Sequence, residues 1–203
     1  MDMSLPISDY PIWEISGFDL PSVNIEKNGP VEYEFQDSLM KQGRVYCTIS
    51  DDNFYTTFKE HCATIEEYIT GDQIITDCPE VKNMWFELLH QFRWPANNPV
   101  IIIDKPGFFM DPHIDNRNVL GILLVNLQDN PPGSGTQFLK DYKKNAPNVI
   151  TYTGPVTKGT GIFMLNNWNT WHSIVNNSNK ERIIAYRTIT IDNLFKYLHD
   201  DPN

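Results

Sequence analysis

Cysteine is scarce in this chain, whose 203 residues include three, Cys47, Cys62 and Cys78. The number is odd, the spacings are wide and no C-x-x-C pair occurs. The sequence therefore indicates neither a disulfide framework nor a zinc ribbon, and we expect reduced thiols that are mostly buried.

Long apolar runs are also missing. No stretch approaches the roughly 18 residues needed to cross a bilayer, and the N-terminal MDMSLPISDY lacks the basic and then apolar pattern of a signal peptide. We therefore expect a soluble, cytoplasmic protein with no membrane partner. Nothing in the sequence indicates its oligomeric state.

Basic residues are outnumbered by acidic ones, 16 to 26, so the formal net charge is −10 and the pI is ≈ 4.8. Proteins that bind polyanions draw most of their affinity from lysine and arginine side chains that release counterions. Nucleic acid is therefore disfavoured as a partner.

Apolar material for a core is plentiful, with 40% hydrophobic and 12% aromatic residues. The first 50 or so residues suggest extended segments, such as VEYEFQ and RVYCTIS, separated by turns. Apolar residues at helical spacing then predict helices over about 53–70 and about 79–93. Ser50, Asp51 or Asp52 is available to cap the first of them.

From Pro99 onward the sequence changes to short segments rich in β-branched and aromatic residues, bounded by Gly, Pro, Asn and Asp. This pattern is typical of an antiparallel sandwich or a small barrel. A last short helix is expected over 194–198. The predicted strands span 100–103, 119–127, 136–139, 149–153, 161–165, 171–175 and 182–191.

A possible metal site lies in the stretch DPHIDNRN. Side chains alternate between the two faces of a strand, so His113 and Asp115 would project to the same side. His172 opens a later strand and is the natural third ligand. Two imidazoles and one carboxylate form the facial triad of non-haem Fe(II) oxygenases. An H-x-D tripeptide alone is weak evidence, because a capped turn with a surface histidine has the same sequence.

The surrounding motifs make the chain resemble the 2-oxoglutarate and Fe(II)-dependent oxygenases of the prolyl-hydroxylase type. A strand and a Pro-Gly turn precede H-x-D in VIIIDKPGFFMDPHID, and GSGTQF matches the family's glycine-rich turn, with Ser134 in place of its second glycine. The stretch GTGIFMLNNWNTWHSIVNNSNKER supplies the distal His172 and then Arg182 ten residues later. The resemblance covers roughly residues 99–191.

The resemblance implies a fold that is mainly β with supporting helices, around a double-stranded β-helix (jelly-roll) core. The core would span 99–191. Residues 1–98 would supply N-terminal strands and two buttressing helices packed on it, and 192–203 a C-terminal helix or tail, all in a single structural domain.

The resemblance also implies an enzyme and its cofactors. Fe(II) would bind His113, Asp115 and His172, with 2-oxoglutarate as cosubstrate, O2 as oxidant and ascorbate as a candidate addition. The products would be succinate, CO2 and a hydroxylated peptide side chain, protein side chain or small metabolite. The alternative is a cupin-like metal- or ligand-binding barrel that does not use 2-oxoglutarate.

The second carboxylate of 2-oxoglutarate needs a cation in a fixed geometry, and the resemblance assigns this role to Arg182. Arg187 is the alternative, and its opposite strand parity means that both cannot point inward without a bulge. Two positions depart from the family pattern: Asp104 replaces a frequent tyrosine, and Ile184 replaces a frequent serine. These changes put other contacts to 2-oxoglutarate in question.

Three further residues flank the proposed ligands. Trp168 and Trp171 would form a wall of the substrate pocket, or simply pack beside the metal site and exclude water. Arg117 would pair with an acidic group of the substrate, or form an ion pair at the surface.

Overall fold

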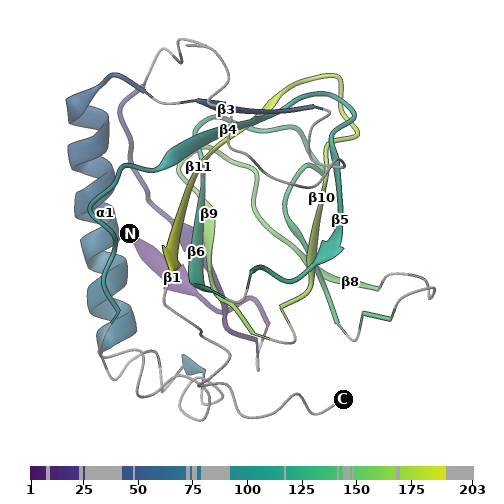
Figure 1. Cartoon of the computed structure of the whole chain (residues 1–203), viewed down its shortest axis with the longest axis horizontal. Coiled ribbons are helices and arrows are strands. Elements are labelled where there is room, and N and C mark those ends of the chain that lie inside the picture. Colours follow the sequence, from purple (N-terminus) through teal and green to yellow (C-terminus); the bar gives the residue numbers. More distant parts are fainter. Residues whose placement is uncertain are drawn as a thin grey trace.

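The computed structural model contains two antiparallel β-sheets that face each other, with one long helix outside the larger sheet (Figure 1). The structure describes residues 1–7, 10–22, 25, 43–47, 49–71, 74, 77–78, 92–116, 118–140, 142–143, 147, 149–167 and 170–190. The predicted helices at 79–93 and 194–198 fall almost entirely outside these residues, as does the segment VEYEFQ.

The major sheet has seven strands in the order β1-β2-β9-β6-β11-β4-β3. Three of them come from the N-terminal part of the chain and lie at the two edges of this sheet. Their bounds are Asp2–Ser4 (β1), Ile12–Ser16 (β2), Arg44–Cys47 (β3), Val100–Asp104 (β4), Val119–Asn126 (β6), Gly161–Leu165 (β9) and Arg182–Thr190 (β11).

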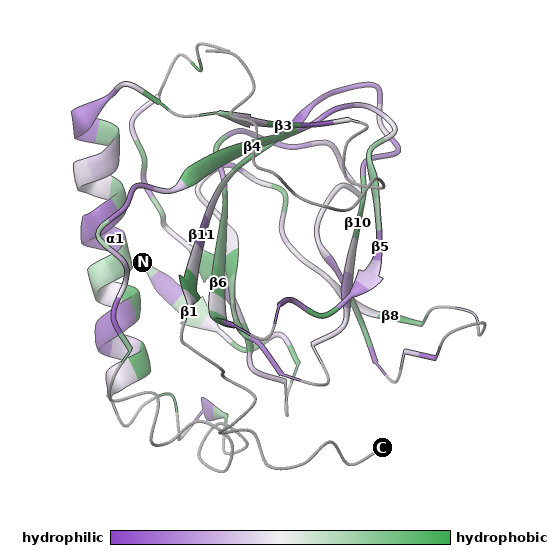
Figure 2. Ribbon diagram, viewed as in Figure 1, coloured by the Kyte–Doolittle hydropathy of each residue, from purple (hydrophilic) through white to green (hydrophobic). Residues whose placement is uncertain are grey.

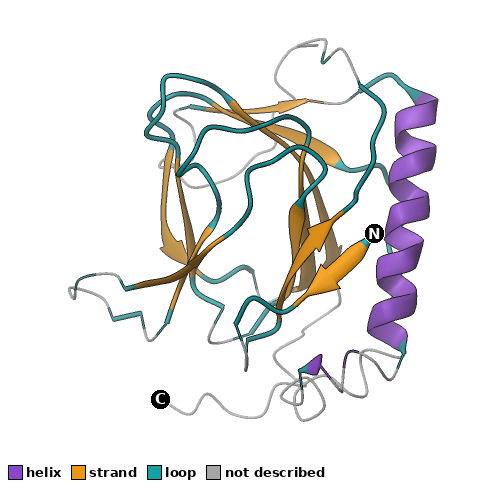
Figure 3. Ribbon diagram, turned by 180° about the vertical axis from the view of Figure 1, so that it is seen from behind, coloured by secondary structure: helices purple, strands orange, loops and turns teal. Residues whose placement is uncertain are grey.

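The minor sheet has four strands in the order β5-β10-β7-β8 and faces the major sheet across the interior (Figure 3). Its strands are Phe109–His113 (β5), Gln137–Leu139 (β7), Ile150–Thr153 (β8) and His172–Val175 (β10). The predictions of a mainly β fold and of the seven strands expected after Pro99 are confirmed, each to within one residue at either end, whereas β5 was not among the predicted strands.

Side chains along each strand alternate between the two faces of the major sheet. In β4, β9 and β11, odd-numbered residues such as Ile103, Phe163 and Ala185 belong to the core shared with the helix. Even-numbered residues such as Met164 and Ile184 face the minor sheet. Because both faces are covered, β4 is apolar along almost its whole length, and it is among the green segments in Figure 2.

Helix α1, Asp52–Thr70, packs against the outer face of the major sheet (Figure 1). Asp51 caps it by accepting a hydrogen bond from the amide of Phe54 at 3.0 Å. Its buried face includes all the residues that the helical spacing predicted: Phe54, Phe58, Cys62, Ile65 and Ile69. No helix among the described residues is long and apolar enough to cross a membrane.

A turn at Pro106-Gly107 carries the chain from the major sheet to the minor one. The amide of Phe108 donates to the carbonyl of Lys105 at 3.0 Å, and Gly107 has φ +81°. Proline followed by a glycine of positive φ is the combination that a type II turn requires. The turn therefore brings β5, with His113 at its end, to face the major sheet. The three cysteines are buried and none forms a disulfide, as expected.

Candidate metal centre and cosubstrate cavity

The two histidines of the site are cross-strand partners. His113 ends β5 and His172 begins β10, and the antiparallel register places them directly opposite each other, with ring centroids 4.3 Å apart. Asp115 lies beyond the end of β5, in the loop that follows. One ligand atom from each residue lies within 4.8 Å of the others. The structure thus brings together the three residues that the sequence proposed as metal ligands.

Backbone carbonyls fix the orientation of both imidazoles. Nδ1 of His113 lies 2.8 Å from the carbonyl oxygen of Asp111, and Nδ1 of His172 lies 2.9 Å from that of Thr170. A carbonyl can only accept, so each Nδ1 carries the proton and each Nε2 keeps a lone pair. Burial lowers the pKa of His172 to about 4, and burial together with His172 lowers the pKa of His113, so both rings are neutral at neutral pH.

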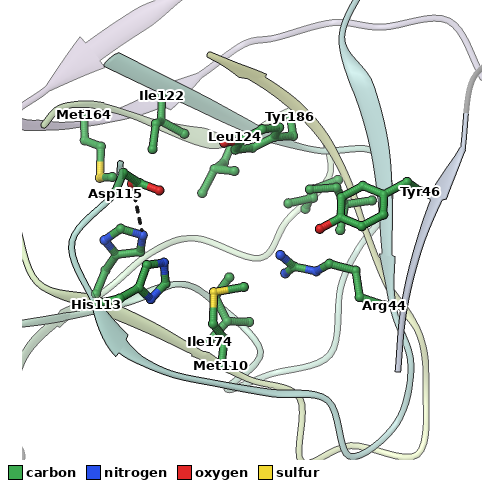
Figure 4. Close-up of a pocket in the computed structure, with 13 residues that line it drawn as sticks. Arg44, Tyr46, Met110, His113, Asp115, Ile122, Leu124, Met164, Ile174 and Tyr186 are labelled. Atoms are coloured by element: carbon green, nitrogen blue, oxygen red, sulfur yellow. Dashed lines mark ion pairs between the residues drawn. The ribbon is translucent and has the colours of Figure 1, made fainter. Parts of the chain in front are cut away.

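One oxygen of the Asp115 carboxylate has no hydrogen-bond donor. Its Oδ2 is buried without a hydrogen-bond partner, and burial raises the pKa of this group to about 6. Oδ2 lies 3.4 Å from Nε2 of His172 (dashed line in Figure 4). Because that nitrogen carries no proton, two lone pairs face each other there. Three converging lone pairs without a proton between them are the arrangement that a divalent cation satisfies, and this donor set suits Fe(II).

Asn166 links the loop that carries Asp115 to the turn that precedes His172. It is fully buried after β9, and its side-chain amide donates to the carbonyls of Asp115, Asn116 and Val119 at 3.4, 3.3 and 3.0 Å. Its Oδ1 accepts a hydrogen bond from the hydroxyl of Thr170 at 3.4 Å. The carbonyl of Thr170 in turn orients His172. One amide therefore links the loop after β5 to the turn before β10.

A cavity of ≈ 630 Å³, including its open mouth, lies between the two sheets beside the proposed ligands. Figure 4 shows His113 and Asp115 on one side of it, and Arg44 and Tyr46 on the opposite side. The remaining lining residues are mostly apolar: Ile102, Met110, Ile122, Leu124, Met164, Ile174 and Ile184, with His172 and Tyr186. The cavity is therefore an apolar chamber with a potential metal site at one end and a cation at the other.

Two arginines and one aspartate form a row across three neighbouring strands. Register places Asp104 of β4 directly between Arg182 of β11 and Arg44 of β3. Asp104 is fully buried, and its carboxylate contacts Arg44 Nε at 2.5 Å, Arg44 Nη2 at 3.0 Å and Arg182 Nη1 at 2.8 Å. Burial lowers the pKa of Arg182. Burial also acts to lower the pKa of Arg44, but Asp104 and Tyr46 together raise it above its usual value.

The glycine-rich motif GSGTQF contributes to the same region. Thr136 accepts a hydrogen bond from Nη2 of Arg182 at 3.2 Å, and Phe138 packs beside His172 with ring centroids 6.0 Å apart. A Cβ on Gly135 would lie 2.2 Å from the carbonyl oxygen of Gly154, so the motif needs a glycine there to bring β7 next to β8. Two of the sequence motifs therefore meet at Arg182.

Two other residues proposed from the sequence, Arg187 and Trp171, lie away from the cavity. Arg187 lies on the opposite face of β11, over the ring of Trp94, and donates to the carbonyl of Asn97 at 3.0 Å. Trp171 is partly buried and packs on Tyr142, with ring centroids 4.5 Å apart, and it is not among the residues that line the cavity. Arg117 and Trp168 fall outside the described residues.

Arg44 and Tyr46 were not identified from the sequence. Their segment RVYCTIS indicated a strand, and the two residues share a face by alternation. No local signal says which strand β3 pairs with, because that pairing joins residues about 60 positions apart. Their presence in the cavity is a consequence of the register between β3 and β4.

Comparisons with known proteins give a match in structure but not in sequence. No model of a known protein family matches the chain, and no curated protein matches it significantly in sequence. The viral collagen prolyl hydroxylase of Paramecium Bursaria Chlorella virus-1, in its 2OG complex, is 16% identical over 90% of this chain and 96% of its own, with a TM-score of 0.52. The chain shares its fold with this prolyl hydroxylase.

Two further structures are similar. A prolyl hydroxylase from Trichoplax adhaerens, in complex with a hypoxia inducible factor peptide fragment, is 14% identical, covers 76% of this chain and 66% of its own, and has a TM-score of 0.46. A Pseudomonas putida prolyl-4-hydroxylase is 12% identical, with 76% of each chain covered and a TM-score of 0.44. The likeness to the viral enzyme confirms the double-stranded β-helix fold that the resemblance implied.

Proposed function

We propose that the protein is a 2-oxoglutarate- and Fe(II)-dependent dioxygenase that hydroxylates a C–H bond, with succinate and CO2 as co-products. The single observation that carries this proposal is the convergence of three lone pairs, from His113, Asp115 and His172, at one end of a largely apolar cavity. Iron bound there, with 2-oxoglutarate and O2, would supply the oxidising chemistry that no amino-acid side chain provides.

The residues of the chain then have separate tasks. His113, Asp115 and His172 would hold the metal, and the cavity that they border would admit the cosubstrate beside it. Apolar side chains such as Leu124 and Ile184 exclude water from the space beside it. The row of charges that contains Arg182 supplies the positive charge for the second carboxylate of 2-oxoglutarate.

For the substrate we propose a peptide or protein side chain, or a small metabolite. The open mouth of the cavity and the fold shared with the viral collagen prolyl hydroxylase support this class. Arg117, Trp168 and Trp171 remain predicted substrate contacts. Ascorbate remains a candidate addition that keeps the iron reduced.

The experiment that tests the function measures succinate formed from 2-oxoglutarate by the Fe(II)-loaded protein with ascorbate and a cell extract as the source of substrate. We expect turnover by the wild type and none by His113→Ala. His61→Ala is the matched control, because His61 lies on α1 and contacts Phe18, outside the major sheet. Equal succinate production by wild type and His113→Ala would overturn the proposal. Metal binding without any binding of 2-oxoglutarate would favour the cupin-like barrel instead.

A further inference from the structure

The arginine that lines the cavity, Arg44, comes from β3, which lies outside the three motifs of the family resemblance. Arg44 lines the cavity, and in Figure 4 its guanidinium points into it from the side opposite His113 and Asp115. Its side chain is 6% exposed. Arg182 is not among the described residues that line this cavity, although it projects from the same face of the sheet.

The hydrogen bonds of the two arginines also differ. Arg182 gives Nη1 to Asp104 and Nη2 to Thr136, so both terminal nitrogens contact the protein. Asp104 binds the Nε and Nη2 edge of Arg44. The rest of the Arg44 guanidinium faces the cavity, where the phenol of Tyr46 is a second hydrogen-bond partner, and a planar guanidinium can still bind a carboxylate with its remaining N–H groups.

The charges in the row sum to one net positive charge, because the single carboxylate of Asp104 lies between two guanidinium groups. A buried positive charge of one unit is complementary to one carboxylate of a ligand. The apolar walls between Arg44 and the proposed metal ligands suit a short chain of methylene groups. The cavity is therefore matched to an anion at each end, one on the metal and one on Arg44.

Arg44 is also held rigidly. Its guanidinium carbon lies 4.4 Å from the centre of the Phe108 ring. Asp104 holds the Nε–Nη2 edge of the same group with two hydrogen bonds. The phenols of Tyr46 and Tyr186 line the cavity beside it. A cation fixed before the ligand arrives loses little conformational entropy on binding, which favours tight recognition.

We propose that Arg44 makes the direct contact with the second carboxylate of 2-oxoglutarate, and that Arg182 is a positioning residue that acts through Asp104. This inference rests on the proposed function. Arg182 offsets the charge of Asp104, so that Arg44 keeps its own charge for the ligand. Residues 1–98 are then part of the cosubstrate site, because β3 supplies its cation and Tyr46 a neighbouring hydroxyl group.

The test compares two 2-oxo acids of equal chain length, 2-oxoglutarate and 2-oxopentanoate, which carries a methyl group in place of the second carboxylate. Calorimetry on the Mn(II)-loaded protein measures the binding of each. Loss of a charge-assisted contact is expected to weaken 2-oxoglutarate binding roughly ten- to hundredfold in Arg44→Gln, and to leave 2-oxopentanoate binding unchanged. Arg44→Lys keeps a charge beside Asp104, which protects the fold, but loses the planar edge; we expect about a tenfold loss.

Arg182→Lys separates the two roles. A lysine there can still pair with Asp104, so we expect 2-oxoglutarate to bind it nearly as tightly as the wild type. Arg93→Gln is the matched control, since the Arg93 side chain is 65% exposed and pairs with Glu66. The affinity for Mn(II), measured in every variant, should remain at the wild-type value and shows that the metal site is folded.

The outcomes are distinguishable. If both Arg44 variants bind 2-oxoglutarate as tightly as the wild type, or if only Arg182→Lys loses affinity, the assignment to Arg44 is wrong and the proposed function stands. If the Mn(II)-loaded wild type binds neither acid, the proposed function is wrong and this inference with it.

Discussion

Replacing Asp115 by asparagine is expected to stabilise the metal-free protein while abolishing metal binding. Without a metal, the buried carboxylate has no proton donor at Oδ2, and burial raises its pKa from 3.8 to about 6. That difference corresponds to roughly 3 kcal/mol of unfavourable free energy for the charged form in the folded state. The side chain is 17% exposed, so this value is an upper bound.

The pH dependence of this gain follows from the direction of the pKa change. Because the folded-state pKa of Asp115 is raised, its contribution to stability is fully present below the unfolded value and is lost as pH rises through about 6. Asparagine carries no charge at any pH. Its advantage over aspartate should be about 3 kcal/mol near pH 7.5 and about 1 kcal/mol near pH 4.5.

Urea denaturation in the presence of a chelator, at both pH values, measures the two free energies of unfolding. Asp111→Asn is the control, because Asp111 is exposed and its neutralisation should change stability little. Adding Mn(II) should stabilise the wild type and not Asp115→Asn, which would reduce or reverse the difference between them. A metal-free Asp115→Asn protein no more stable than the wild type at pH 7.5 would refute the reasoning.

Three further substitutions test other parts of the structure. Asp104→Asn removes the counter-charge of two buried arginines and should cost roughly 3–5 kcal/mol in urea denaturation; a loss under 1 kcal/mol would show that the row is not an ion-pair cluster. Asn166→Ala frees the loops beside two ligands and should weaken Mn(II) binding about ten- to hundredfold by calorimetry, and unchanged affinity would contradict its positioning role. Phe163→Ala deletes a fully buried ring that contacts Trp13 and should lower the free energy of unfolding by about 3–5 kcal/mol, with unchanged Mn(II) affinity in the folded protein.

Local patterns in the sequence were sufficient to predict helix α1 and most of the strands. The helical spacing from Phe54 to Ile69 predicted α1 and its buried face, since a helix must turn its apolar stripe toward a core. Short runs rich in β-branched and aromatic residues predicted most of the strands of both sheets. Strands β1 and β2 at the N-terminus were not assigned individually, because short segments carry little periodic signal.

Strand alternation does not explain how His113 and Asp115 come to the same side, although the sequence predicts it. Strand β5 ends at His113, so Asp115 is placed by the following loop. Asn166 holds that loop through backbone carbonyls. The sequence does not reveal this contact, because the two segments are about 50 residues apart.

By itself, the sequence determined the mainly β character, most of the strands, the main helix and the set of residues from which a metal site could be built. The elements depend on local periodicity, and the metal ligands were identified by residue types within motifs that resemble a known family. Only the tertiary structure decided which side chains share the cavity. The register of β3 against β4 and of β4 against β11 sets Arg44, Asp104 and Arg182 in one row. Shifting a strand by one residue would turn its side chains to the other face, so long-range pairing decides whether Arg44 reaches the cavity.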